Sequence, residues 1–199
     1  MFNLQIILSN LVAAVILVSV KGFTKALVSS RLGDPIPRRD RRVTLNPLAH
    51  VEPIGLLLLV FTGFGWEKPV ETSRIHYKNR KQDTLVTSLA PLLAVLLVSV
   101  IAFNVLFSVP LHLYVALLLH SVAFMGATWV FWQLLPIYPM EGQKIFTQFL
   151  SANRVMSLAN MEKTLLILLI LILFMFPGNM VTGLPSLLGE NLLRLLRFV

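Results

Sequence analysis

Long apolar runs separated by short polar segments dominate the chain. Residues 4–20 carry no charged side chain, and no Asp, Glu, Lys or Arg occurs between Asp83 and Glu141. That interval has room for two segments of about 20 residues, the length that crosses a bilayer. The pattern predicts membrane spans at about residues 4–28, 85–107, 111–135 and 161–176, the last of them closed by Pro177-Gly178-Asn179.

The remaining segments are too short or too polar to span. Residues 54–65 are strongly apolar but too few to cross, so we expect a re-entrant or interfacial segment there. It lies within an expected β/loop insertion at residues 36–82, with a short strand at Val43–Leu45. Residues 143–158 are expected to form a surface helix. An amphipathic tail at 187–199 is expected to be an interfacial helix.

These elements predict an all-α integral membrane protein, a bundle of about four to five membrane segments in a single domain, residues 1–199. Composition agrees, because 56% of residues are hydrophobic and 13% are charged, against about 45–50% and 25% in soluble domains. With no cysteine, a disulfide, a thiolate zinc site and a cysteine nucleophile are all excluded.

The net charge of +8 fits membrane topology better than nucleic-acid binding. Basic residues cluster at residues 21–42, 68–81 and 144–163, which together hold 15 of the 17. The positive-inside rule places these loops in the cytoplasm and the N-terminus outside. Lysines follow the first apolar run instead of preceding it, so we expect an uncleaved anchor. A bacterial inner membrane is the expected location.

Three stretches, in this order, resemble the site-2 protease family of intramembrane zinc metalloproteases. The first runs from Ala26-Leu27 through Gly33-Asp34-Pro35 to Leu45-Asn46-Pro47 and beyond. The second, Gly65-Trp66-Glu67-Lys68-Pro69-Val70, is similar to the family's Gly-Trp-Ala-Lys-Pro-Val element. The third, Leu134-Leu135-Pro136-Ile137-Tyr138-Pro139-Met140-Glu141-Gly142-Gln143, stands where the family has a Pro-rich stretch leading to Leu-Asp-Gly-Gly.

The resemblance implies a zinc site built from a His-Glu-x-x-His helix and the aspartate of Leu-Asp-Gly, with the glutamate as general base. In this chain the two histidines fall on Lys21 and Lys25, the glutamate falls on Gly22 and the aspartate falls on Glu141. Zinc needs ligands with a free lone pair, whereas a lysine ammonium has three donors and no acceptor. Zinc is therefore expected for the family and not for this chain, which has no expected cofactor.

Charge suggests what replaces the metal. Zinc would contribute two positive charges, and Lys21 and Lys25 also contribute two. A carboxylate at membrane depth is costly unless it is paired, so we hypothesise an ion pair between Glu141 and one or both lysines. The alternative is that the lysines extend to the cytoplasmic surface and Glu141 lies in water.

Two other groups invite a functional interpretation. The cluster Arg38, Arg39, Arg41 and Arg42 could bind anionic lipid headgroups, or it could serve topology alone. His50 is expected to hydrogen-bond a loop backbone, although it could be a remnant of the site.

The leading hypothesis is a pseudoenzyme of this family that works by binding membrane-protein partners or as a subunit of a membrane complex. An edge formed by Val43–Leu45 and residues 54–64 could hold another chain by strand addition. One alternative is an active intramembrane metalloprotease with an atypical site. Another is a purely structural accessory subunit of a bioenergetic or transport assembly. Membrane lipid is an expected partner and nucleic acid is not.

Overall fold

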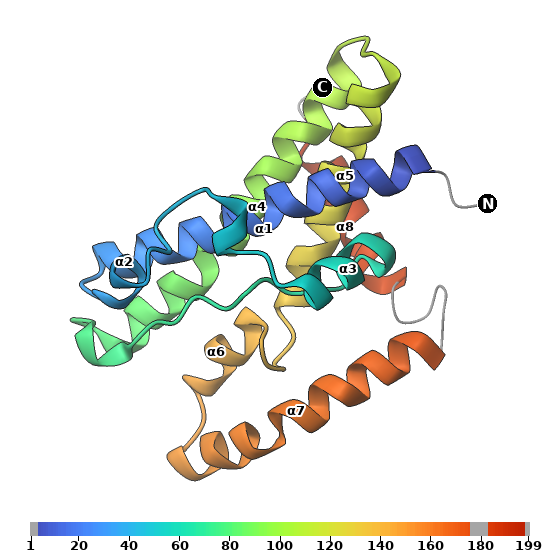
Figure 1. Cartoon of the computed structure of the whole chain (residues 1–199). Helices are drawn as coiled ribbons and strands as arrows, with labels where there is room; N and C mark the ends of the chain where they lie inside the picture. Colours follow the sequence, from blue (N-terminus) through green and yellow to red (C-terminus); the bar gives the residue numbers. More distant parts are fainter. Residues whose placement is uncertain (1–3, 176–182, 198–199) are drawn as a thin grey trace.

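The computed structural model describes residues 4–175 and 183–197. Its helices are α1 (Leu4–Arg31), α2 (Ile36–Arg39), η1 (Pro47–Ala49), α3 (Pro53–Thr62), η2 (Arg74–His76), α4 (Arg80–Ser108), α5 (Leu113–Gln133), α6 (Glu141–Thr147), α7 (Ala152–Met175) and α8 (Gly183–Leu195). Figure 1 shows their arrangement. The expected Pro177-Gly178-Asn179 terminator lies outside the described residues.

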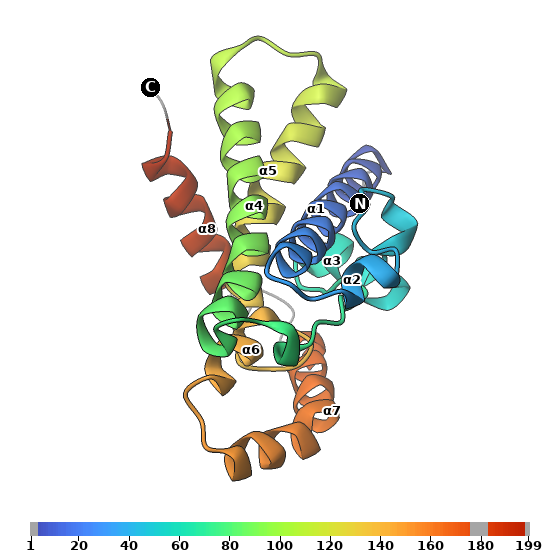
Figure 2. The ribbon, with the colours of Figure 1, turned by 90° about the vertical axis from the view of Figure 1, so that its left-hand side faces the viewer.

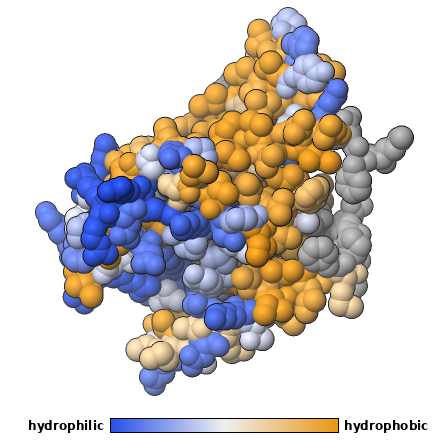
Figure 3. Space-filling model, viewed as in Figure 1, coloured by the Kyte–Doolittle hydropathy of each residue, from blue (hydrophilic) through white to orange (hydrophobic). Residues whose placement is uncertain are grey.

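Four helices, α1, α4, α5 and α7, are long and apolar enough to cross a membrane. The chain is therefore an all-helical membrane bundle, as its apolar runs predicted. Figure 3 shows hydrophilic residues gathered over α2 and the neighbouring loops, while hydrophobic residues cover much of the remaining surface in that view. This division suits a protein with one polar end outside the hydrocarbon layer.

The centre of the bundle is the crossing of α1, α4 and α5, which lie together in both ribbon views (Figures 1 and 2). Gly126 on α5 marks the closest approach. A Cβ at Gly126 would lie 2.1 Å from the Ser99 hydroxyl oxygen of α4 and 2.9 Å from a methyl group of Leu17 on α1. In lipid the hydrophobic effect does not drive helices together, so membrane helices associate largely through van der Waals packing. Small residues at a crossing allow that packing, because they let the two backbones approach closely.

The two C-terminal helices pack very differently. Helix α8 lies against α5, where Leu193 is fully buried and a Cβ at Gly189 would lie 2.9 Å from the backbone nitrogen of Thr128. Only 6% of the apolar stretch of α7 is buried inside the protein, against 39% of the apolar stretch of each of the other three long helices. Both views place α7 beyond α6, away from α4 and α5 (Figures 1 and 2). Interfacial placement of the tail stays a prediction.

Helix α3 is short because both of its ends are capped. The Glu52 side chain accepts from the backbone N–H of Gly55 at 2.5 Å, and Pro53 begins the helix. Gly63 ends it in the left-handed conformation, with φ 72°. Ten residues span about 15 Å, half of a hydrocarbon core of about 30 Å. A re-entrant or interfacial placement remains our prediction for this segment.

The expected β component of the insertion at residues 36–82 is wrong, since no strand occurs among the described residues. Around Val43–Leu45 the backbone groups are used locally. The N–H of Thr44 donates to the carbonyl of Arg42 at 2.9 Å, and the Thr44 carbonyl lies 2.7 Å from His50 Nε2. A turn and a side chain thus take the place of a strand partner.

The expected surface helix at residues 143–158 is divided in two. Helix α6 ends at Thr147, and residues 152–158 already belong to α7, which begins well before the predicted span at 161. The Thr147 hydroxyl and the Gln148 side-chain amide both donate to the carbonyl of Lys144, at 3.1 and 2.8 Å. These bonds satisfy an acceptor that the next helical turn would have used.

Candidate functional site

Lys21 and Lys25 lie on the face of α1 that is turned into the protein. Four residues apart on a helix, they project to the same side. Their exposed fractions are 0% and 3%, so both ammonium groups are inside the fold. Trp129 of α5 lies against Lys21, with 5.6 Å from its Nζ to the ring centroid, a cation–π geometry.

Glu141 meets both lysines from the start of α6. Its carboxylate oxygen Oε1 accepts from Lys25 Nζ and lies 3.2 Å from Lys21 Nζ, and the residue is 1% exposed. Gly142 allows this approach, because a Cβ there would lie 2.1 Å from the carbonyl oxygen of Leu134. The end of α5 and the beginning of α6 are thus pressed together beneath α1.

Glu67 completes the cluster, and sequence reasoning missed it. It belongs to the extended segment of residues 64–73, it is 4% exposed, and its Oε1 accepts from Lys21 Nζ. Trp129 Nε1 fixes the chain before it by donating to the Gly65 carbonyl at 2.8 Å. The Lys68 N–H fixes the chain after it by donating to the His50 carbonyl at 2.8 Å.

We call Lys21, Lys25, Glu67 and Glu141 the lysine–glutamate quartet. Two ammonium groups face two carboxylates, so the buried cluster is formally neutral. Burial opposes ionisation of Glu141, but Lys25, Lys21 and Lys144 outweigh it and lower its pKa to about 2. Pairing of this kind is what makes a buried charge tolerable, since removing one partner leaves the other uncompensated.

Gly22 occupies the position aligned with the family's general base, and the space beside it is filled. The His50 ring lies there, and a Cβ at Gly22 would be 2.2 Å from His50 Nδ1. His50 is fully buried and its Nε2 is bonded to the Thr44 carbonyl. Burial lowers the pKa of His50 below its ordinary value, and the nearby Arg42 acts in the same direction. The bond to the Thr44 carbonyl opposes this shift, and it agrees with the expected hydrogen bond from His50 to a loop backbone.

As built, the quartet does not offer a zinc site. Catalytic zinc takes three protein ligands with free lone pairs and keeps a fourth position for water. Here the lysines present donors only, and the carboxylates of Glu67 and Glu141 already accept from them. Throughout residues 4–175 and 183–197, no group of three or more His, Cys, Asp or Glu side chains is placed to hold a metal ion.

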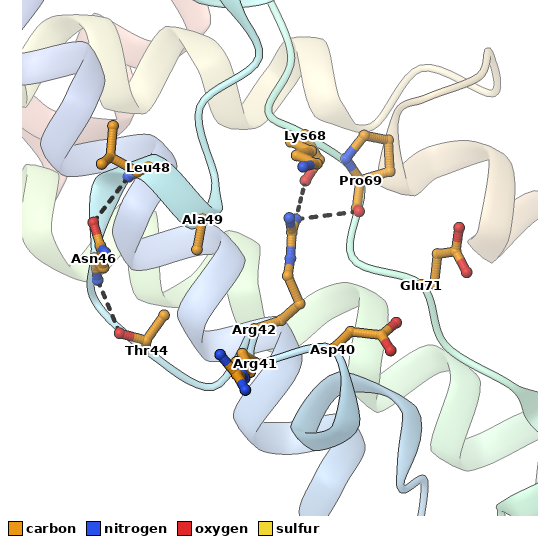
Figure 4. Close-up of a pocket in the computed structure, with 10 residues that line it drawn as sticks. All are labelled: Asp40, Arg41, Arg42, Thr44, Asn46, Leu48, Ala49, Lys68, Pro69 and Glu71. Carbon is orange, nitrogen blue, oxygen red and sulfur yellow. Dashed lines mark hydrogen bonds between the residues drawn. The ribbon is translucent and has the colours of Figure 1, made fainter.

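Apart from the quartet, a groove opens at the surface beside the extended segment that carries Glu67. This loop groove, about 520 Å³ in volume, lies between the loop at residues 40–49 and residues 68–71 (Figure 4). Arg42 crosses it, and its Nη2 donates to the carbonyls of Lys68 at 2.5 Å and Pro69 at 3.2 Å. Leu48 borders the groove and is 84% exposed. The groove therefore combines polar walls with an exposed apolar side chain.

The arginine cluster proposed for lipid headgroups is split by the fold. Arg42 is buried and holds backbone carbonyls, as described above. Arg39 pairs with Asp40 at 3.2 Å on the surface. Arg38 and Arg41 are exposed. Lipid binding by the exposed members stays a prediction.

Comparison with known proteins finds one similar protein in Bacillus subtilis (strain 168), named "Putative zinc metalloprotease YwhC". The two are 28% identical over 131 residues, which cover 60% of this chain and 59% of the relative. No family model and no solved structure matches the chain. The similarity supports a site-2-protease-like relationship and nothing finer, and this chain spans less than two thirds of the relative's length.

Proposed function

We propose that this chain is a catalytically inactive relative of the site-2 proteases that binds a membrane-protein partner, as a subunit of a membrane complex. The observation that carries the proposal is the lysine–glutamate quartet, three of whose members, Lys21, Lys25 and Glu141, stand at the positions aligned with the family's metal ligands. Without a metal, the pKa of a water stays near 15.7 instead of falling to about 7. Gly22 offers no base to compensate. On this proposal zinc is not a cofactor of this chain, and the zinc ligands of the family are lost.

The quartet would keep the structural role of a metal after the reaction is gone. It joins α1, the extended segment and the start of α6, three parts separated by 46 and 120 residues from Lys21. A zinc ion held by the His-Glu-x-x-His helix and the Leu-Asp-Gly aspartate would join two of these parts, the ones that correspond to α1 and the start of α6, in the same way. The charges also match, because two ammonium groups supply the two positive charges of the ion.

The loop groove is the surface that we propose for the partner. Strand addition at Val43–Leu45 is not available, since that segment forms a turn. The groove instead presents the extended chain at residues 68–71, with Leu48 exposed beside it. Leu45 is exposed close by in the same loop. A partner segment near the membrane surface could bond the polar side chains of the groove and cover these leucines.

Placement in the membrane is part of the proposal. The polar end of the bundle would face the cytoplasm of a bacterial inner membrane, with the N-terminus outside, because the basic loops gather there. The exposed arginines Arg38, Arg39 and Arg41 would then lie at the level of anionic lipid headgroups.

A zinc measurement tests the inactive site. The full chain, purified in detergent, is dialysed against micromolar zinc and its bound metal is counted by mass spectrometry. We expect well below one zinc per chain, and a tight stoichiometric zinc that is lost in the variant Glu141→Ala would contradict the proposal and revive the alternative of a protease with an atypical site.

A cross-linking experiment tests the partner. A photoreactive amino acid replaces Leu48 in cells, and the matched control replaces Leu97, an exposed leucine on α4. We expect a discrete adduct with one membrane protein from position 48 and none from position 97. If both positions yield the same unspecific products, the groove holds no partner. An unchanged adduct in Glu141→Ala, at equal protein level, would favour a purely structural accessory subunit.

A further inference from the structure

A small cavity lies at the polar end of α4, apart from the loop groove. Its volume is about 170 Å³, enough for several water-sized groups at about 30 Å³ each. Its walls come from the segment around η2, from α4 and from α6, and they carry hydroxyl groups and two cations, Arg74 and Lys144. No acidic side chain lines it. We call it the hydroxyl cavity.

The hydroxyl proton of Tyr77, one of the lining residues, is already used. The Ser29 hydroxyl donates to a carboxylate oxygen of Asp34 at 3.0 Å, and an ionised carboxylate can only accept. Ser29 and the Tyr77 hydroxyl are 2.8 Å apart. Since Ser29 has spent its single proton on Asp34, Tyr77 must be the donor in that pair, and it has none left for the cavity.

Two of the three threonines of the wall, Thr84 and Thr87, are committed in the same way. The Thr84 hydroxyl donates to the carbonyl of Arg80 at 2.6 Å, and the Thr87 hydroxyl lies 2.7 Å from the carbonyl of Asp83. These are bonds to the preceding helical turn, which leave only lone pairs for other partners.

Besides the half-buried Thr72, three donors remain, and they converge on the cavity from different elements. Ser88 on α4 is 1% exposed, and its hydroxyl oxygen has no hydrogen-bond partner. The ammonium group of Lys144 on α6 donates no hydrogen bond and forms no ion pair within the described part of the chain. Arg74 donates from Nη2 to Thr147 at 3.3 Å, and its other N–H groups have no ion-pair partner among the described residues. A buried hydroxyl without a partner is rare enough to require one.

The carboxylates of Asp34 and Glu141 do not satisfy these donors. Asp34 accepts from Ser29, from the N–H of Ser73 at 2.8 Å and from the N–H of Ile36 at 3.1 Å. Glu141 Oε1 accepts from the quartet lysines, and neither carboxylate oxygen bonds Lys144, Arg74 or Ser88. The cavity therefore has surplus positive charge and surplus donors, and the ligand that suits it accepts hydrogen bonds and is negative.

We propose that the hydroxyl cavity binds a phosphate group. The oxygen atoms of a phosphate group can accept from Arg74, Lys144 and Ser88 at once, and charge-assisted bonds of this kind are the strong ones. The uncharged stretch of α4 starts at Thr84, so the cavity lies where the helix passes out of the apolar layer. Inorganic phosphate and the phosphate of an anionic lipid headgroup share this chemistry.

Binding is measured on the full chain in detergent by its thermal midpoint. Sodium phosphate is titrated against sodium chloride at equal ionic strength, and short-chain phosphatidic acid is titrated against short-chain phosphatidylcholine. A ligand that binds only the folded protein raises the midpoint in a saturable manner. A saturable rise with inorganic phosphate assigns the site to free phosphate, and a rise with phosphatidic acid alone assigns it to a lipid headgroup.

Two variants locate the site. Ser88→Ala removes one hydroxyl without a change of shape, and Arg74→Gln removes a charge from an exposed side chain. Each is expected to weaken binding about tenfold, as loss of a hydrogen bond to a charged group does. The control is Lys78→Gln, an equal charge change at an exposed residue that does not line the cavity. If neither ligand raises the midpoint, or if the control weakens binding as much as the variants do, the cavity holds water and the proposal is wrong.

Discussion

Removal of Glu67 is the sharpest test of the neutral quartet. The substitution Glu67→Ala leaves Lys21 fully buried, with Glu141 at 3.2 Å as its one remaining carboxylate, and Glu141 is already shared with Lys25. The cluster then carries a surplus positive charge inside the protein. Breaking a buried pair in this way costs about 3–5 kcal/mol of the free energy of unfolding.

The expected change is large enough for a simple assay. At about 2–4 °C per kcal/mol for a chain of this size, the thermal midpoint should fall by about 6–20 °C. Intrinsic fluorescence can follow it, since Trp129 lies against Lys21 and is fully buried. The matched control is Glu71→Ala, an exposed glutamate four residues further along the same extended segment, for which we expect a change within about 0.5 kcal/mol.

A double-mutant cycle separates pairing from packing. Lys21→Met combined with Glu67→Ala leaves Lys25 with Glu141, again one positive and one negative charge. The double variant should therefore be more stable than the sum of the two single changes predicts, by about 1–3 kcal/mol. If the two effects add, or if Glu67→Ala behaves like Glu71→Ala, the quartet is not an electrostatic unit and the reasoning fails.

Three further predictions follow from the site. Gly22→Ala should destabilise the protein by about 1–3 kcal/mol through overpacking, because the new Cβ would meet the His50 ring. Adding His50→Ala should recover part of the loss in thermal midpoint, and purely additive effects would argue against a clash between the two side chains. Arg42→Gln should lower the free energy of unfolding by about 1.5–3 kcal/mol, since Arg42 bonds two backbone carbonyls. The substitution Arg41→Gln at an exposed residue should change the thermal midpoint little, and equal effects would show that the Arg42 bonds to the two carbonyls do not stabilise the fold. The pKa of Glu141 is about 2 in the folded protein, against 4.5 for the ordinary group. The contribution of its carboxylate to the stability of the fold is therefore complete above about pH 4.5 and lost as the pH falls toward 2, so the thermal midpoints of wild type and Glu141→Gln should converge over that window. Parallel curves of midpoint against pH would show that the carboxylate is not paired.

Part of the candidate site could be predicted from order along the chain. Lys21, Lys25 and Glu141 were named because they fall at the metal-ligand positions of motifs that follow one another along the chain in the order expected for the family. Glu67 was passed over, although it was visible as the one acidic departure in an element where the family has alanine. The signal was a charge count, because two lysines against one glutamate leave a surplus that a buried cluster cannot carry.

The helical membrane class was determined by the sequence itself. Apolar runs of about 20 residues must satisfy their own backbone groups in lipid, and a helix does so within the segment. That local rule explains why the long helices were predictable, and why Val43–Leu45 was not. There the choice between strand and turn depends on which partner the backbone groups find. Arg42 bonds the carbonyl of Lys68 and His50 bonds the carbonyl of Thr44, so side chains hold this segment in place of a strand partner.

Tertiary structure alone decided which way the charges face. Lysines at positions 21 and 25 could equally reach the membrane surface as ion-pair inside the bundle, because both outcomes are compatible with one helix face. The choice depends on Glu67 and Glu141, which lie 46 and 120 residues from Lys21, and on the His50 ring that fills the space beside Gly22. Contacts across such separations are set by packing, which no local pattern of residues encodes.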